Sequence, residues 1–193
     1  MRWALLALLP VAACSSGGTP ALCETKIALV DHTAWSALGD GDDPFDPPAG
    51  SDGDAGPRRG RCAGAMMMPE PLNEEPSFTM DTNQCAYGTV TQPALAAVAA
   101  GEMLTIRVWY FSQTKSEPAV ADVEVAFGDT PIWMRAVPLP VVSGGLLIDH
   151  FAAPSALAAG APIRWHVSNH GTNTWNIVEV SVTRKVPCRE VGS

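Results

Sequence analysis

The carboxyl-terminal half of the chain alternates apolar and polar residues with a period of two. In the segment 103–111, alternate apolar residues run from Leu104 to Tyr110 and are interleaved with Thr105 and Arg107. The segments 121–127 and 177–183 show the same alternation. A period of two predicts strands with one face buried and one face exposed.

Four further segments have the composition of short strands: 87–91, 132–137, 146–151 and 163–167. Gly and Pro turns separate them, and a helix is possible only over short stretches such as 94–100. The fold class expected is therefore all-β, with a single antiparallel β-sandwich over residues 76–188.

Residues 23–75 lack this rhythm. They are rich in Asp, Gly and Pro, above all between residues 40 and 57, and offer only a short apolar element at Ile27–Val30. Such a segment buries little apolar surface of its own, so we expect it to be irregular and partly disordered.

The first thirteen residues have a different character. Arg2 precedes a short apolar run of Ala and Leu, which is too short to span a bilayer as a stable helix and is typical of an export signal. Residues 14–22 contain uncharged Ser and Gly directly after Cys14, which is the composition of a flexible tether.

The tetrapeptide Val11-Ala12-Ala13-Cys14 resembles the lipobox of bacterial lipoproteins, with Val where Leu is more usual. The resemblance implies a signal peptide of residues 1–13, cleavage before Cys14 and acylation of Cys14. It also implies a lipid-anchored protein of the bacterial cell envelope, and Ser15 after the cysteine fits sorting to the outer membrane. The alternative is an ordinary secretory signal cleaved elsewhere.

Charge narrows the range of partners. The chain carries a formal net charge of -8, and loss of Arg2 with the signal would make it one unit more negative. An acidic protein is a poor ligand for nucleic acid or for anionic lipid. We therefore expect a membrane partner only through the N-terminal lipid.

Four cysteines remain after Cys14, namely Cys23, Cys62, Cys85 and Cys188. An even number in an exported protein predicts two disulfides. Three pairings are possible, and we favour Cys23 with Cys62 and Cys85 with Cys188. No two of these cysteines have the close spacing of a thiolate metal site, and we expect neither a metal nor another cofactor.

The segment 164–175 concentrates residues suited to ligand binding. Two tryptophans can stack on the apolar faces of a sugar ring while imidazole and amide groups bind its hydroxyls. The candidate ligand-binding residues are Trp165, His166, Asn169, His170, Asn173 and Trp175. The competing interpretation is a tight turn at 169–171, with the tryptophans filling the core.

Over residues 85–183 the chain resembles the jelly-roll and galactose-binding-like β-sandwich modules of bacterial surface proteins. The likeness consists of the strand rhythm, the Ala-Gly turns before strand entry and the polar loop 169–175. It implies a non-catalytic module that binds carbohydrate or another envelope protein.

A rival hypothesis is a metalloprotein or hydrolase centred on His150, His166 and His170. On one strand His166 and His170 share a face but lie about 13 Å apart, too far for one metal unless the chain turns. The chain also lacks a nucleophile elbow and an H-E-x-x-H motif. We therefore expect a protein that is not an enzyme, in a purely structural role if it binds no ligand.

Overall fold

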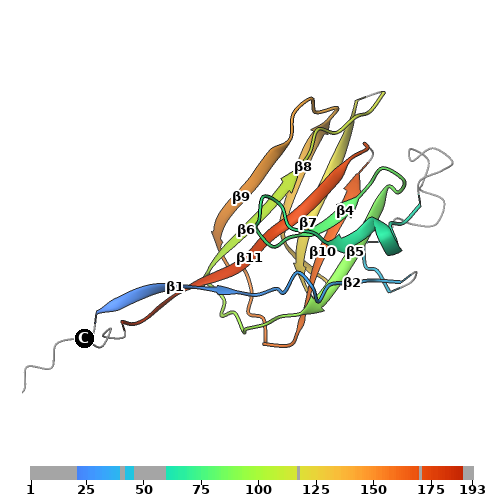
Figure 1. Cartoon of the computed structure of the whole chain (residues 1–193). Helices are drawn as coiled ribbons and strands as arrows, with labels where there is room; N and C mark the ends of the chain where they lie inside the picture. Colours follow the sequence, from blue (N-terminus) through green and yellow to red (C-terminus); the bar gives the residue numbers. More distant parts are fainter. Residues whose placement is uncertain (1–20, 40–41, 46–59, 117, 170, 189–193) are drawn as a thin grey trace, which may run out of the picture.

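The computed structural model describes residues 21–39, 42–45, 60–116, 118–169 and 171–188. In these residues the chain forms two antiparallel sheets around one core, which confirms the predicted all-β sandwich (Figure 1). Sheet A consists of β1 (Leu22–Ala28), β3 (Met67–Pro69), β4 (Phe78–Asp81), β6 (Met103–Tyr110), β9 (Gly145–Ala152) and β11 (Thr174–Pro187). Sheet B consists of β2 (Ser36–Ala37), β5 (Tyr87–Pro93), β7 (Ala119–Phe127), β8 (Thr130–Leu139) and β10 (Pro162–Asn169).

The strand order is β3-β4-β11-β6-β9 in sheet A, with β1 also paired to β11, and β2-β5-β10-β7-β8 in sheet B. The predicted alternation places Leu104 and Ile106 of β6 opposite Val123 and Val125 of β7, and all four are fully buried. Burial of apolar surface, about 25 cal/mol per Å², therefore holds the two sheets together. A short 3-10 helix, η2 (Gly64–Met66), precedes β3. No helix among the described residues is long and apolar enough to cross a bilayer.

The segment 23–75, expected to be irregular, contributes strands to both sheets. β1 pairs with β11 from Leu22↔Pro187 to Ala28↔Ser181, β2 pairs with β5, and β3 pairs with β4. These strands are ordered by hydrogen bonds to neighbours that are distant in sequence, so a local apolar pattern is not required. Residues 46–59 lie outside the described residues.

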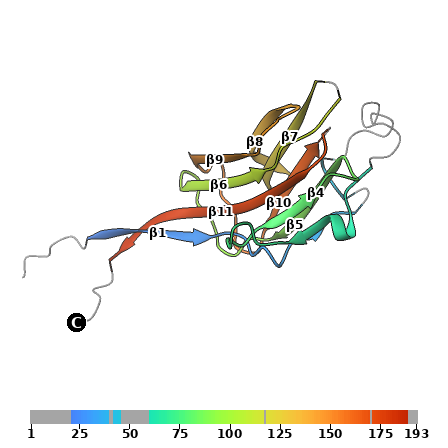
Figure 2. The same cartoon turned by 45° about the horizontal axis from the view of Figure 1, so that its top comes forward.

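A two-stranded stem projects from the sandwich. It is formed by β1 and the end of β11, and it extends away from the two sheets in both views (Figures 1 and 2). The disulfide Cys23–Cys188, with a Cα–Cα distance of 5.0 Å, lies at the far end of the stem. The stem therefore joins the two ends of the described chain covalently.

The second disulfide links Cys62 and Cys85, which are both buried. Two disulfides are thus confirmed, but the favoured pairing of Cys23 with Cys62 and of Cys85 with Cys188 is wrong. Cys23 lies opposite Val186 in the β1–β11 register, which brings it next to Cys188 across a sequence separation of 165 residues. Strand pairing, which sequence spacing does not reveal, decided the connectivity.

A β-bulge interrupts the alternation of β11. Ile177 pairs with Val108 and Glu179 pairs with Arg107, so Val178 is an extra residue on β11. The sequence predicted that Val178 faces the core with Val180 and Val182, yet the bulge turns it to the outer side of sheet A, where it lines a cavity.

Candidate functional site

The tryptophans of the predicted binding segment lie in the core. Trp165 and Trp175 are both 0% exposed, and Trp175 packs against Tyr110 with ring centroids 5.1 Å apart. Trp133 is also buried, and its Nε1 donates to Asp149 at 2.7 Å. A ring without solvent-accessible surface cannot stack on a sugar, so Trp165 and Trp175 do not form a binding platform in this structure.

His166 lies on the outer side of sheet B but is covered. The Phe45 ring stacks on it at 5.0 Å, and its Nδ1 is hydrogen-bonded to Thr89 Oγ1 at 2.7 Å. Burial lowers the pKa of His166 to about 4, with Asp43 opposing and Arg61 reinforcing the shift. Asp43 and Arg61 form an ion pair at 3.0 Å. The imidazole is neutral at pH 7 and is not accessible to a ligand.

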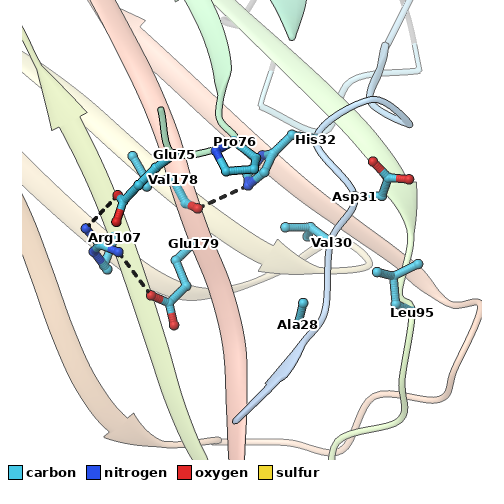
Figure 3. A pocket seen from close by; sticks show the side chains of 10 residues that line it. All are labelled: Ala28, Val30, Asp31, His32, Glu75, Pro76, Leu95, Arg107, Val178 and Glu179. Carbon is cyan, nitrogen blue, oxygen red and sulfur yellow. Dashed lines mark hydrogen bonds and ion pairs between the residues drawn. The ribbon is translucent and has the colours of Figure 1, made fainter. Parts of the chain in front are cut away.

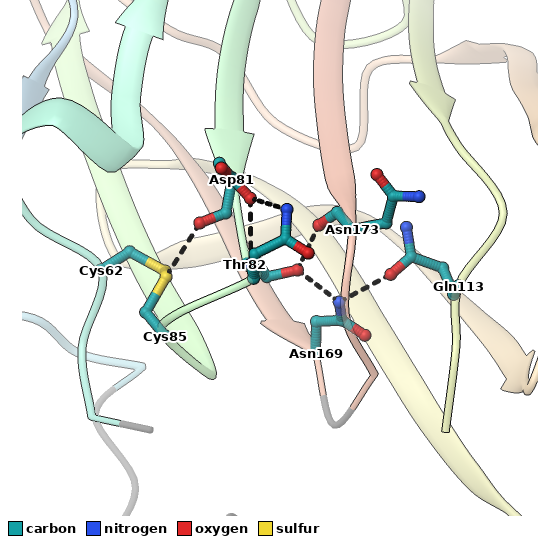
Figure 4. The surroundings of a disulfide bond; sticks show 8 residues. Cys62, Asp81, Thr82, Cys85, Gln113, Asn169 and Asn173 are labelled. Atoms are coloured by element: carbon teal, nitrogen blue, oxygen red, sulfur yellow. Dashed lines mark hydrogen bonds between the residues drawn. A yellow bond between two sulfur atoms is a disulfide. The ribbon is translucent and has the colours of Figure 1, made fainter. Parts of the chain in front are cut away.

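The two asparagines of the segment hold its turn in place. Asn169 Nδ2 donates to Thr82 Oγ1 at 2.6 Å and to Gln113 Oε1 at 2.8 Å, and Asn169 is fully buried (Figure 4). Asn173 Nδ2 donates to the Ser112 carbonyl at 2.6 Å. These amides support the connection between β10 and β11. His170 lies outside the described residues.

The histidines do not converge in the part of the chain that the structure describes. His150 is on β9 of sheet A, opposite Thr105, whereas His166 is on β10 of sheet B. Among the described residues, no group of three or more His, Cys, Asp or Glu side chains is placed to hold a metal ion. Cys14, the predicted lipidation site, lies outside the described residues.

A different region carries an open cavity that is lined by both apolar and charged residues. A groove of about 510 Å³ lies on the outer side of sheet A, at the bulge of β11 (Figure 3). We call it the β11 groove. Its lining residues are Ala28, Val30, Asp31, His32, Glu75, Pro76, Leu95, Arg107, Val178 and Glu179.

Two ion pairs cross the β11 groove. Arg107 contacts Glu75 at 3.0 Å and Glu179 at 3.4 Å. Glu179 also pairs with Lys26 at 2.7 Å and accepts a hydrogen bond from Ser181. Burial raises the pKa of Glu179, but the bonds from Lys26, Ser181 and Arg107 outweigh it and lower the pKa below its usual value. The Glu179 carboxylate is therefore ionised at neutral pH.

His32 is hydrogen-bonded to the backbone of the β11 bulge. Its Nε2 donates to the carbonyl of Val178 at 3.0 Å, the peptide that the bulge leaves outside the regular ladder. Burial lowers the pKa of His32, against the opposing effects of the Val178 carbonyl and of Asp31. The pKa of Asp31 is itself lowered by hydrogen bonds from the Thr33 amide and hydroxyl. The buried Nδ1 of His32 has no hydrogen-bond partner among the described residues.

A second cavity, of about 360 Å³, lies on the same side of sheet A. We call it the Asn176 cavity, and its lining residues are Glu70, Pro71, Leu72, Phe111, Asn173, Thr174 and Asn176. Asn176 is 3% exposed, and its Oδ1 accepts from Thr79 Oγ1 at 2.6 Å. Its Nδ2 has no partner among the described residues. A buried amide donor without a partner is uncommon, and a water molecule or a ligand in the cavity can supply the acceptor.

A hairpin at residues 70–76 separates the two cavities. The Leu72 and Glu75 backbones exchange hydrogen bonds of 2.9 and 3.0 Å. Asn73 and Glu74 have positive φ angles of 51° and 71°, as a two-residue type I′ turn requires. Leu72 lines the Asn176 cavity and Glu75 lines the β11 groove, so the hairpin forms a wall common to both.

Trp109 lies beside residues of both cavities, since it pairs in register with Asn176 and follows Arg107 on the outer side of β6, and it was not among the predicted site residues. It is partly exposed and lies between Asn176 on β11 and Leu146 on β9. Its position was available from the sequence, because Trp109 alternates with Val108 and Tyr110 and so faces outward with Arg107. The cavities themselves have no sequence signature.

No protein-family model matches the chain, and no curated protein sequence matches it. Its fold is similar to that of TmCBM27, a carbohydrate-binding module described for its specific mannan recognition. The identity is 7% and the TM-score 0.47, with 88% of this chain and 100% of that one covered. A Stig cyclase from Fischerella sp. TAU is similar at 12% identity and TM-score 0.45, covering 91% of this chain and 93% of that one.

A carbohydrate-binding module described as CBM4 is similar at 15% identity and TM-score 0.37, with 69% of this chain and 83% of that one covered. At these identities and TM-scores, the likenesses carry no argument about function.

Proposed function

We propose that the outer side of sheet A binds a carbohydrate chain without catalysing its conversion. The observation that carries the proposal is Asn176, which lines a cavity, carries a buried Nδ2 without a partner among the described residues, and pairs in register with the partly exposed Trp109. Sugar sites in water combine a flat apolar surface with fixed hydrogen-bonding groups. Trp109 supplies the first, and Asn176, Glu75 and His32 supply the second.

The test is a glycan-array screen of the purified protein and of its Trp109→Ala variant. We expect the wild type to bind a glycan and Trp109→Ala to weaken binding about tenfold or more, because the stacking surface is removed. Trp109→Phe should restore part of the affinity, since it keeps an aromatic face.

Met134→Ala is the matched control, because Met134 is an exposed apolar residue of sheet B, 53% exposed and away from both cavities. It should bind like the wild type. A folded wild type that binds no glycan would overturn the carbohydrate proposal. An equal loss of glycan affinity in Trp109→Ala and Met134→Ala would mean that the binding site is not on sheet A.

The exposed apolar residues of the same face favour a second candidate, contact with an envelope protein. Leu146 and Ile148 of β9 are 36% and 46% exposed and lie beside Trp109 and Arg107. If no glycan binds, Ile148→Ser should weaken the association with such a partner.

We place this domain at the bacterial cell envelope, held by lipid on Cys14, as the lipobox-like segment predicts. Cys14→Ser should leave a protein that no longer partitions into the detergent phase. Partitioning unchanged by Cys14→Ser would overturn the lipid anchor and leave the sugar site unaffected.

A further inference from the structure

The charges around the two cavities determine which class of glycan they accept. Four carboxylates line them, from Asp31, Glu75, Glu179 and Glu70, and the charged cations beside them are Arg107 and Lys26. Carboxylates therefore outnumber cations at the site. This excess has the same sign as the net charge of the whole chain, which is -8.

Arg107, the cation inside the groove, is already paired. Its two guanidinium nitrogens Nη1 and Nη2 are directed at Glu179 and Glu75, at 3.4 and 3.0 Å. Lys26 is held by Glu179 at 2.7 Å. An incoming carboxylate or sulfate would have to displace one of these carboxylates to reach a cation, and it would meet the others at close range.

Glu75 is an exposed acceptor of the β11 groove. Its side chain is 54% exposed, and Arg107 fixes its position on the hairpin wall. His32 also lines this groove, and its buried Nδ1 has no hydrogen-bond partner among the described residues. A group of fixed acceptors suits a ligand that donates hydrogen bonds, which hydroxyl and ammonium groups do.

We infer, on the basis of the proposed carbohydrate site, that the site selects glycans whose contacting sugars are neutral or carry amines, and that it excludes uronate, sulfated and phosphorylated sugars. The ion-pair network of Arg107 excludes anionic sugars, because it presents carboxylates to the ligand and leaves neither Arg107 nor Lys26 unpaired.

The experiment is a glycan array at low ionic strength with neutral, amino and anionic glycans equally represented. We expect hits among the first two classes and none among the third. The strongest neutral hit is then compared with its own C6-oxidised uronate form, which should bind at least about tenfold more weakly. The difference should shrink in about 0.5 M salt, where the Debye length falls below about 5 Å.

Glu75→Gln sharpens the test, because it removes one carboxylate and leaves Arg107 Nη2 without its ion-pair partner, while Nη1 stays paired with Glu179. It should raise the affinity for the uronate form about threefold or more and lower the affinity for the neutral form. Glu24→Gln is the matched control: it makes the same change of charge on the exposed stem strand β1, outside the groove, and should change neither affinity.

The outcomes separate the two proposals. Hits confined to anionic glycans, or a uronate form that binds as tightly as the neutral one, would overturn the charge selection and leave carbohydrate binding intact. If Glu75→Gln and Glu24→Gln changed the two affinities equally, the β11 groove would not be the origin of the charge selection. A folded protein without any hit would overturn the proposed function and this inference with it.

Discussion

The outer sides of the two sheets contain similar residues but differ in what covers them. On sheet B, His166 lies between Thr89 and Glu124, and the segment 42–45 covers it with Phe45. On sheet A, Trp109 lies between Asn176 and Leu146 and stays partly exposed between two cavities. An aromatic or imidazole group on the outer side of a strand is therefore a candidate binding residue only where no loop covers it.

The largest expected effect is on the unfolding free energy, and it distinguishes the core residue Trp175 from the partly exposed Trp109. Trp175→Ala should cost about 3–5 kcal/mol of unfolding free energy, because it leaves a cavity in the core. Trp109→Ala should cost clearly less and affect mainly ligand binding. Urea unfolding of both variants measures the difference, and equal losses would mean that Trp109 is a packing residue like Trp175.

The cover over sheet B depends on the Cys62–Cys85 disulfide, which lies beside Arg61 and hence beside the Arg61–Asp43 pair. Replacing both cysteines with Ala should cost about 3 kcal/mol, the chain-entropy value for a loop of this length. It should also expose His166 and raise its pKa toward that of free histidine, measured by NMR titration. The corresponding change at Cys23 and Cys188 should leave the His166 pKa unchanged, and a shift there would contradict this assignment.

The buried imidazole of His166 makes stability depend on pH. Its pKa is lowered to about 4 in the folded protein, so between its ordinary pKa of about 6.5 and 4 the unfolded chain binds more protons. Stability should be complete above the ordinary pKa and fall by about 2 kcal/mol from pH 7 to pH 5.

His166→Gln should remove most of this slope, because glutamine does not titrate and can still bond to Thr89. Urea unfolding of both proteins at pH 7 and pH 5 measures it. A slope of the same size in the variant would assign the pH dependence to other groups.

The smallest expected effect is on the stability of the hairpin at residues 70–76, between the two cavities. Glu74 has a φ of 71°, a region that glycine adopts without a steric penalty. Glu74→Gly should therefore raise the unfolding free energy by up to about 1 kcal/mol, seen as a higher Tm. A lower Tm would show that the Glu74 side chain makes a stabilising contact on this wall.

Much of the sandwich was predictable from the sequence, because burial between two sheets requires a period of two. The strands around Leu104, Val123 and Ile163 follow that pattern and lie where it predicts. The sequence did not reveal features that depend on distant partners, such as the cysteine pairing and the bulge at Val178. The candidate site depends on such partners, since Glu75, Arg107 and Glu179 come from three separate parts of the chain.

The sequence by itself determined the two-sheet architecture, the acidic charge and the number of cysteines available for pairing, because each follows from local pattern or composition. The tertiary structure alone decided which cysteines pair, which tryptophans are buried and where the cavities lie. These properties depend on which strands become neighbours and on which loop covers which face. Hydrogen bonding and packing between residues far apart in the sequence fix both.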